Sequence, residues 1–90
     1  MELIDTVYIS NLPSLDLHGF DRDSARVAIN EFINDNIKKK NKKIVIVHGV
    51  GEGIIKRETH NVLRRHKNVE DYAICYNNIG STIVRLKFDK

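Results

Sequence analysis

The sequence predicts an α/β (α+β) two-layer sandwich, in which two helices pack on a four-stranded mixed sheet in the order β-α-β-α-β-β. Ninety residues are enough for one small domain with a single core. Two segments with apolar residues at spacings of three and four alternate with runs of strand-forming residues, which is the pattern of helices between strands. Hydrophobic residues make up 41% of the chain and charged residues 30%, so the composition is that of an ordinary folded domain.

Four strands are predicted from their residue patterns. Residues 44–47 form a continuous β-branched run, which is typical of a covered parallel strand. An Asn/Gly turn at 77–80 joins the last two strands. The two strand–helix–strand crossovers have the length of right-handed parallel units, so only the last strand is expected to be antiparallel. The predicted strands are residues 15–19, 44–47, 72–76 and 82–88.

Two helices are predicted between these strands. Asp21 has the position of an N-cap, and Lys38–Lys40 fall in the last turn of the first helix, where cations suit the negative end of the helix dipole. The second helix follows Gly53 and runs to His66. Their apolar faces consist of Ala25, Ala28, Ile29, Phe32, Ile33 and Ile37 in the first helix, and of Ile55, Thr59, Val62, Leu63 and His66 in the second.

Length, cysteine content and hydropathy exclude several classes of protein. No apolar run approaches the ~20 residues of a membrane span, and the first residues lack the basic region and apolar stretch of a secretory signal. The one cysteine, Cys75, cannot form an internal disulfide and is expected to be a small buried residue. We therefore expect a cytoplasmic protein without a membrane partner. Residues 1–14, with a candidate strand at 7–9, are interpreted as an N-terminal extension to a domain of residues 15–90.

Charge is unevenly distributed, although the net charge is only +3. Residues 1–36 carry two basic and seven acidic side chains, residues 37–67 carry ten basic and two acidic, and residues 68–90 balance. A positive surface of this kind favours phosphate-rich partners. Solvated helix ends and a basic turn at 38–43 would explain the same counts.

A glycine-rich loop, Gly49-Val50-Gly51-Glu52-Gly53, lies between a predicted strand and a predicted helix. Three glycines let backbone amides approach a ligand closely, and the following helix N-terminus favours an anion. A tight turn without a ligand is the alternative interpretation. The loop lacks the Gly-Lys-Ser/Thr of a nucleotide-hydrolase phosphate loop, and Ile54 stands where a dinucleotide fingerprint needs its third glycine.

A second candidate site is the Asp16-Leu17-His18 sequence at the end of the first predicted strand. A carboxylate beside an imidazole can orient it for proton transfer, and the same pair could ligate a metal ion. A solvated Asp16 and a His18 packed on a helix is the alternative, because so short a motif is weakly specific.

Both candidate sites are expected at the same edge of the sheet. His18-Gly19 and His48-Gly49 each follow a predicted parallel strand, and ligands of open α/β sheets bind outside the carboxyl ends of the strands. The basic turn at 38–43 precedes a strand and belongs to the opposite edge. Lys56, Arg57, Arg64 and Arg65 are therefore the better phosphate-binding candidates, while His60 and His66 are interpreted as structural or solvated.

These motifs, followed by Gly80-Ser81-Thr82, form a series that resembles the Smr (small MutS-related) domain family over residues 15–88. The resemblance implies the same two-layer sandwich and a function in cleaving nucleic acid. The family is associated with nicking of DNA and with cleavage of RNA. Members that cut RNA keep the Asp-x-His motif, here Asp16 and His18, whereas members with another residue at the His position are regarded as binding modules. Nucleic acid, and further the ribosome, are the partners that it implies.

The resemblance also assigns roles to residues. It implies Asp16, His18 and His48 as catalytic residues, the last of which could instead only anchor the loop. The basic residue that opens the second helix corresponds to Lys56. Phosphate or nucleic-acid contacts are expected from Gly49, Gly51, Gly53 and Lys56 on this resemblance, and from Arg57, Arg64 and Arg65 on their predicted position alone.

Two further interpretations remain at this point. No cofactor is expected, but a divalent metal such as Mg²⁺ or Mn²⁺, held by Asp16, His18 and His48, could activate water instead. Val50 stands in the glycine loop where Lys or Arg is often found in the family, and Glu52 puts a carboxylate where a phosphate should approach. Both departures favour a nucleic-acid- or ribosome-binding module without turnover.

Overall fold

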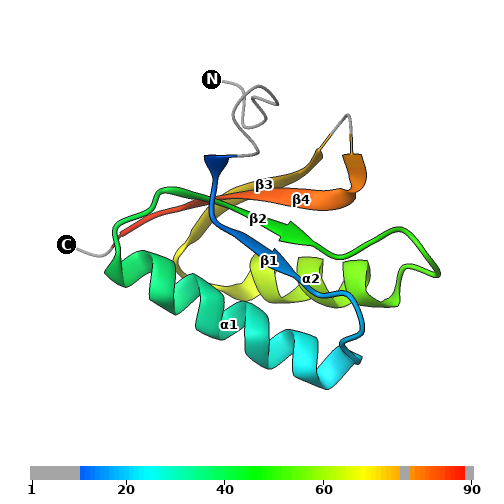
Figure 1. Cartoon of the computed structure of the whole chain (residues 1–90). Coiled ribbons are helices and arrows are strands. Elements are labelled where there is room, and N and C mark those ends of the chain that lie inside the picture. Colours follow the sequence, from blue (N-terminus) through cyan, green and yellow to red (C-terminus); the bar gives the residue numbers. More distant parts are fainter. Residues whose placement is uncertain (1–10, 76–77, 89–90) are drawn as a thin grey trace.

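The computed structural model describes residues 11–75 and 78–88 and has one four-stranded sheet with two helices on one of its faces (Figure 1). This is the predicted two-layer architecture. The elements are β1 (Ser14–Asp16), α1 (Arg22–Lys38), β2 (Lys43–Val47), α2 (Ile54–Arg65), β3 (Val69–Cys75) and β4 (Asn78–Leu86).

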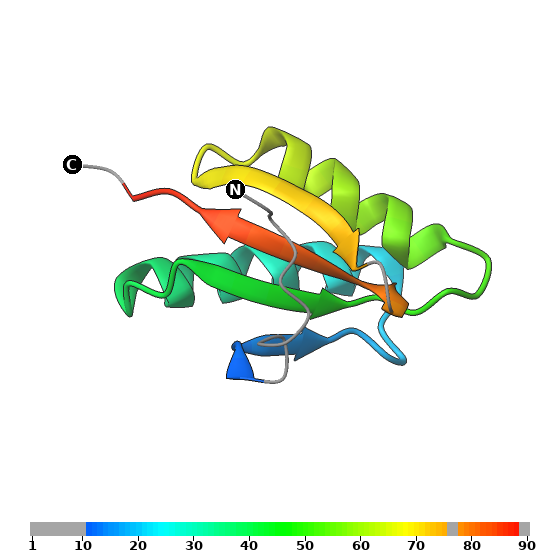
Figure 2. The same cartoon turned by 90° about the horizontal axis from the view of Figure 1, so that it is seen from above.

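The strands lie in the order β1-β2-β4-β3. β1 and β2 pair in parallel, and β4 runs antiparallel to both β2 and β3. The predicted antiparallel last strand is therefore confirmed, but β3 is not the neighbour of β2, because β4 lies between them (Figure 2). Since β4 is central, both of its faces are covered: Ile83 and Val84 point to opposite faces and are both buried.

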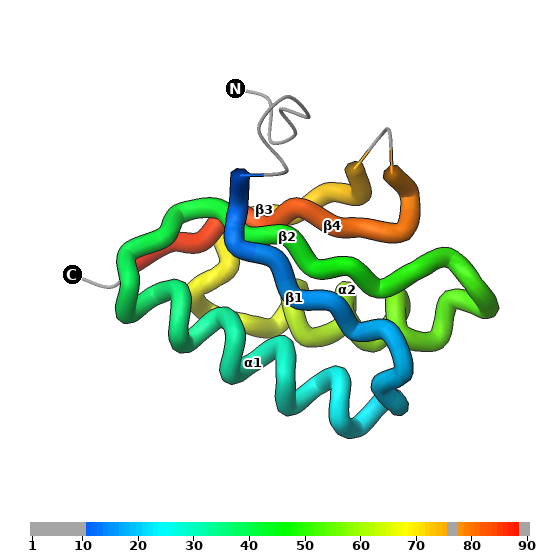
Figure 3. The backbone as a smooth tube through the Cα atoms, in the orientation of Figure 1, coloured from blue at the N-terminus to red at the C-terminus, as the bar shows by residue number. Residues whose placement is uncertain are grey.

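The connections between strands and helices lie at two opposite ends of the sheet. The segments after β1 and after β2 lie at one end, and the basic connection from α1 to β2 lies at the other (Figure 3). This arrangement follows from the parallel pairing of β1 with β2, and it confirms the predicted placing of residues 38–43 away from the glycine loop.

The main core lies between the sheet and the helices. Ile29 and Ile33 of α1, Leu63 of α2, and Ile46 and Val84 of the sheet are buried in it. Each such side chain contributes about 1.5–3 kcal/mol relative to an exposed position. A smaller cluster on the other face of the sheet consists of Val45, Cys75 and Ile83 with the partly buried Leu12 and Val47 packed against it.

The start of α1 matches the sequence prediction, whereas the helix ends at Lys38, so Lys39 and Lys40 lie beyond the last turn predicted for them. The Asp21 carboxylate accepts a hydrogen bond of 2.8 Å from the Ser24 backbone N–H, and Lys38 lies in the last turn. This hydrogen bond lowers the pKa of Asp21. α2 begins instead after Gly53, whose φ of +83° is the left-handed conformation that glycine adopts freely.

The first strand is shorter than predicted, since it ends at Asp16 and not at Gly19. Residues 17–20 form a turn in which the Phe20 N–H donates to the Leu17 carbonyl, with Gly19 at φ +83°. The alternation of residues predicts that Asp16 and His18 share one strand face. This prediction is wrong, because the strand ends at Asp16 and His18 lies in the turn. The candidate strand at 7–9, Tyr76 and Asn77 fall outside the described residues.

Candidate functional site

The turn after β1 and the glycine loop after β2 lie side by side. Asp16 is in register with Val47, and the Leu17 N–H donates to the Val47 carbonyl at 2.9 Å. As a result, residues 17–20 and 48–56 line one hollow of about 400 Å³. The predicted convergence of the two strand ends is confirmed, because His18, the whole glycine loop and Lys56 all line this hollow.

Asp16 contacts the backbone of His18, not its ring. The Asp16 Oδ1 atom accepts a hydrogen bond of 2.9 Å from the His18 backbone N–H. Within residues 11–75 and 78–88, neither ring nitrogen of His18 has a hydrogen-bond partner. The carboxylate thus stabilises the turn that presents the exposed imidazole, an arrangement typical of an aspartate that caps a turn.

The glycine loop is fixed at its first residues by β4. The Gly80 carbonyl accepts hydrogen bonds from the His48 and Gly49 backbone N–H groups at 2.9 and 2.8 Å. The approach is close, since a Cβ atom on Gly80 would lie 3.3 Å from the Gly49 Cα atom. The Gly49 amide, predicted to bind phosphate, is therefore already engaged.

The remaining amides of the loop are available. In the described part of the chain, the N–H groups of Gly51 and Gly53 have no hydrogen-bond acceptor. The first intrahelical bond of α2 runs from the Arg57 N–H to the Gly53 carbonyl, so the amides before Arg57 also lack helical partners. Together with the positive end of the helix dipole, these donors suit an anion in the hollow.

His48 anchors the loop from within the protein. It is only 9% exposed, and both ring nitrogens are engaged: Nδ1 lies 2.8 Å from the Gly49 carbonyl, and Nε2 lies 2.8 Å from the Thr82 hydroxyl. The same hydroxyl lies 2.8 Å from the Nε2 atom of His60. Thr82, which is fully buried, therefore joins the glycine loop to α2.

The chemistry of these partners fixes the direction of the hydrogen bonds. A carbonyl only accepts, so His48 Nδ1 donates to Gly49. When His48 is neutral, its Nε2 atom accepts the hydroxyl hydrogen of Thr82. The Thr82 oxygen then accepts from the Nε2–H group of His60. One arrangement of neutral tautomers satisfies every partner, and the described residues contain no buried side-chain nitrogen or oxygen without one.

Burial lowers the pKa of His48 and of His60 below the ordinary value of 6.5, and nearby positive charges lower both further. Lys56 acts on both rings, while His48 and Arg64 act on His60. Burial also lowers the pKa of His66. The neutral network is therefore the favoured state near pH 7.

These shifts predict acid sensitivity of the folded state. Because the folded pKa values lie below the unfolded value of 6.5, the unfolded chain binds more protons, and stability should fall as the pH drops from about 6.5 downward. We expect a lower urea midpoint at pH 5.5 than at pH 7.5. Asp21, with its own pKa lowered from 3.8, acts only in a more acidic range. Equal midpoints at the two pH values would contradict this prediction.

The predicted cations do not all reach the hollow. Lys56 lines it, and Lys56, Arg57 and Arg64 line a second hollow on the outward face of α2. Arg65 follows Arg64 by about 100° around the helix and lies instead at the groove between α1 and α2. Val50 and Glu52 are exposed where they line the first hollow.

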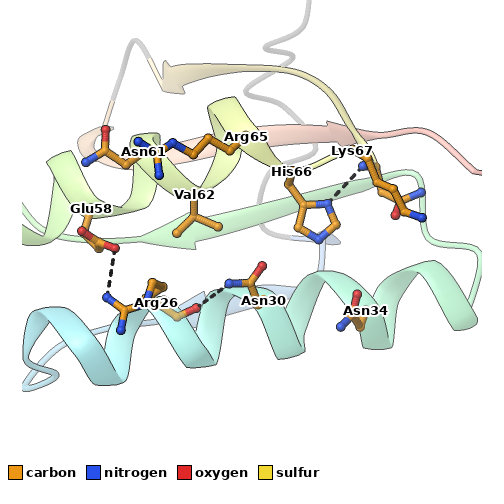
Figure 4. A pocket seen from close by; sticks show the side chains of 10 residues that line it. Arg26, Asn30, Asn34, Glu58, Asn61, Val62, Arg65, His66 and Lys67 are labelled. Atoms are coloured by element: carbon orange, nitrogen blue, oxygen red, sulfur yellow. Dashed lines mark hydrogen bonds and ion pairs between the residues drawn. The ribbon is translucent and has the colours of Figure 1, made fainter.

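The groove between the helices is a separate feature (Figure 4). Arg26 of α1 approaches Glu58 of α2 at 3.6 Å, and the Asn30 amide donates to the Arg26 carbonyl at 3.1 Å. Its basic side chains are thus partly neutralised by Glu58. Arg65 is the one predicted site residue among those that line this groove.

The geometry does not assemble the metal-binding set that the sequence left open. Both nitrogens of His48 are hydrogen-bonded, and Asp16 is engaged with the backbone of His18. In residues 11–75 and 78–88, no three His, Cys, Asp or Glu side chains cluster closely enough to hold a metal ion.

Neither helix of the described residues has the length and apolar character that a membrane span requires.

The sequence does not predict the hydrogen bonds of Thr82 and His60. It places Thr82 in a predicted strand, and the structural role that it predicts as one alternative for His60 is confirmed, since His60 is half-buried and its Nε2 atom is hydrogen-bonded to Thr82. Thr82 lies 34 positions after His48, so only the pairing of β2 with β4 brings them together. The signal available in the sequence was a polar residue, Thr82, directly before the apolar Ile83-Val84 pair of the predicted strand.

Comparisons with known proteins identify the family and the fold. The Smr domain family model matches residues 15–87. Two relatives named Endonuclease MutS2 are 32% identical over 76 residues (Staphylococcus saprophyticus) and 35% identical over 75 residues (Streptococcus pyogenes). The matches cover 81% and 80% of this chain but 10% of each relative, so the chain spans about a tenth of their length.

Two solved structures share the fold. The Smr domain of Thermus thermophilus MutS2 superposes with a TM-score of 0.82 at 24% identity, covering 84% of this chain and 99% of that one. YdaL, a stand-alone small MutS-related protein from Escherichia coli, gives a TM-score of 0.78 at 20% identity, covering 82% and 63%. With the family model spanning nearly the whole described chain, this protein belongs to the Smr domain family.

Proposed function

We propose that this protein is an endonuclease that cleaves the phosphodiester bonds of nucleic acid, with RNA as the favoured substrate. The observation that carries the proposal is the shared hollow, which is lined both by the exposed His18 and by the loop and helix residues whose amides suit a phosphate. The name Endonuclease MutS2, carried by the relatives, supports the same class of reaction. The proposal places the protein in the cytoplasm, where RNA and ribosomes are available as partners.

In the proposed reaction, His18 removes the proton from a ribose 2′-hydroxyl, and the resulting oxygen attacks the adjacent phosphorus. The bond from phosphorus to the 5′-oxygen breaks, leaving a 2′,3′-cyclic phosphate on one fragment and a 5′-hydroxyl on the other. Asp16 is a positioning residue, since it holds the backbone of the turn that presents His18.

The charge that develops on the phosphate is stabilised by the amides of Gly51 and Gly53 and by the helix N-terminus. Lys56 supplies a proton or positive charge at the leaving oxygen, because it lines the hollow while His48 has both nitrogens occupied. His48 then contributes by fixing the loop.

A binding module without turnover is the second candidate function. The observation in its favour is that no side chain of the described residues hydrogen-bonds and orients the His18 ring. The exposed carboxylate of Glu52 at the rim of the hollow also weakens its attraction for phosphate.

The deciding experiment is incubation of the purified protein with single-stranded RNA in excess EDTA. We expect cleavage without added metal and 2′,3′-cyclic phosphate ends. The matched control is the same oligonucleotide with a single 2′-deoxy nucleotide at each cut position, which should resist cleavage there. Binding of RNA without cleavage, with or without Mg²⁺ or Mn²⁺, would favour the binding module.

A further inference from the structure

A second hollow, of about 510 Å³, lies on the outward face of α2. Its cationic side chains are Lys56, Arg57 and Arg64, and no carboxylate lines it. Glu58, the one acidic residue of α2, is directed at Arg26 of α1 instead. The hollow is therefore a concentration of positive charge without an acidic partner in its lining.

This hollow is continuous with the glycine-loop hollow. Gly53 and Lys56 line both. From Lys56 to Arg64 the helix rises by about 12 Å, which is the length of roughly three stacked nucleotides at ~3.4 Å each. A strand whose phosphate sits at the glycine loop would thus carry its neighbouring phosphates along this face.

His60 contributes a different chemistry to the same hollow. Its ring is half-buried, packs at 5.1 Å between centroids on Tyr72, and meets His48 edge-on at 5.7 Å. The Nε2 atom is hydrogen-bonded to the Thr82 hydroxyl, whereas Nδ1 has no hydrogen-bond partner among the described residues. The ring is thus held rigidly, with one nitrogen unused, in the lining of a cationic hollow.

We propose that Lys56, Arg57, His60 and Arg64 form a second phosphate subsite, which binds a phosphodiester next to the one at the glycine loop. The inference rests on the proposed function, because it assigns further contacts to the same nucleic-acid strand. It goes beyond that function by giving His60 a phosphate contact. It also assigns Arg57 and Arg64 to the subsite but not Arg65, which lies at the groove between the helices.

The hydrogen-bond chain couples this subsite to a proton. His48 donates to the Gly49 carbonyl and, when neutral, accepts from Thr82, so Thr82 must accept from His60 Nε2–H. Neutral His60 then has no hydrogen on Nδ1. Donation from Nδ1 to a phosphate therefore requires uptake of one proton, and His60 becomes imidazolium.

The groups around His60 determine when this uptake occurs. Lys56 and Arg64 of α2 and the His48 ring oppose its positive charge, and Tyr72 of β3 and Thr82 of β4 contact it without charge. A bound phosphate offsets the cations. Strand binding should therefore strengthen as the pH falls, by up to about tenfold per pH unit in the range between the pKa of His60 in the free protein and its higher pKa in the complex.

The binding experiment uses the full chain and an uncleavable 2′-O-methyl oligoribonucleotide. We expect Arg57→Ala and Arg64→Ala each to weaken binding about tenfold at low salt and to reduce the salt slope by about 1. The matched control is Lys42→Ala, which removes an exposed cation at the opposite end of the sheet and should bind within about twofold of wild type. Equal losses in all three variants would overturn the subsite.

The proton coupling is tested with His60→Gln, whose amide can still donate to Thr82 but cannot titrate. We expect the affinity of this variant to depend less steeply on pH than that of wild type, because residue 60 no longer takes up a proton. The His60 ring nitrogens of wild type, followed by ¹⁵N NMR, should show a higher pKa when the oligonucleotide is added. A wild-type affinity independent of pH, or an unchanged His60 pKa, would overturn the assignment of His60.

These outcomes separate the two proposals. Wild type that binds the oligonucleotide through Arg57 and Arg64, but never cleaves RNA, would contradict the endonuclease and leave the subsite standing. If wild type cleaves RNA, and the variants of Arg57, Arg64 and His60 bind the oligonucleotide as wild type does, the subsite is contradicted and the endonuclease stands. Wild type that does not bind the oligonucleotide would overturn both.

Discussion

Replacement of His18 by alanine is expected to lower the rate of RNA cleavage by about 10²–10⁴-fold, the range that a general base contributes. The side chain is exposed, lines the hollow and makes no hydrogen bond within the described residues, so its loss should leave the fold intact. The measurement is the single-turnover rate on single-stranded RNA, together with affinity for an uncleavable 2′-O-methyl strand. Affinity should change by less than about threefold, because the phosphate contacts come from other groups.

The matched control for this variant is His66→Ala, which removes a histidine that lines the groove between the helices. It should cleave at the wild-type rate. If folded His18→Ala also cleaves at that rate, the assignment of the base is wrong.

Variants of Asp16 distinguish what its carboxylate does. Asp16→Asn retains an oxygen that can accept the hydrogen bond from the His18 backbone N–H, whereas Asp16→Ala does not. If Asp16 acts through the turn, Asn should keep most of the cleavage rate and Ala should lose it. Equal losses in both variants would show that the negative charge itself is needed, as in the carboxylate–imidazole pair that the sequence suggested.

Replacement of Thr82 by valine is expected to lower the free energy of unfolding by about 2–6 kcal/mol. Valine preserves the shape of threonine but removes the hydroxyl, which leaves the Nε2 atoms of His48 and His60 without their partner. Each buried polar group left unpaired costs about 1–3 kcal/mol. The effect is large against the total stability of about 5–15 kcal/mol typical of a small domain.

Thr82→Ser is the matched control. It keeps the hydroxyl and loses one buried methyl group, which should cost about 1 kcal/mol. Urea denaturation at pH 7.5 measures both variants. A serine variant less stable than the valine variant would contradict the role given to the hydroxyl.

The elements of this protein are largely encoded in local sequence. The N-cap at Asp21, the apolar stripe of each helix and the β-branched run at 44–47 depend on neighbours within a few positions, so the sequence predicts them closely. The edge of the sheet that carries the site also follows from sequence, because the carboxyl ends of the parallel strands β1 and β2 lie at the same edge.

The first strand shows where a local pattern is misleading. Alternation over 15–19 predicted that Asp16 and His18 share a face, but the chain turns after Asp16 because Gly19 adopts a positive φ and the Asp16 carboxylate caps the turn. Residues 17–19 are compatible with both a strand and a turn. They form the turn because the pairing of β1 with β2 ends at Asp16.

Sequence by itself determined the number, type and order of the elements and the end of the sheet where the site lies. Tertiary structure alone decided that β4 enters between β2 and β3, and this placing brings Thr82 to His48 and the Gly80 carbonyl to the glycine loop. It also decided that Arg64 and Arg65 face different hollows. The physical reason is that periodicity reports which face of an element is buried, whereas the neighbours met on that face depend on contacts between residues far apart in the chain.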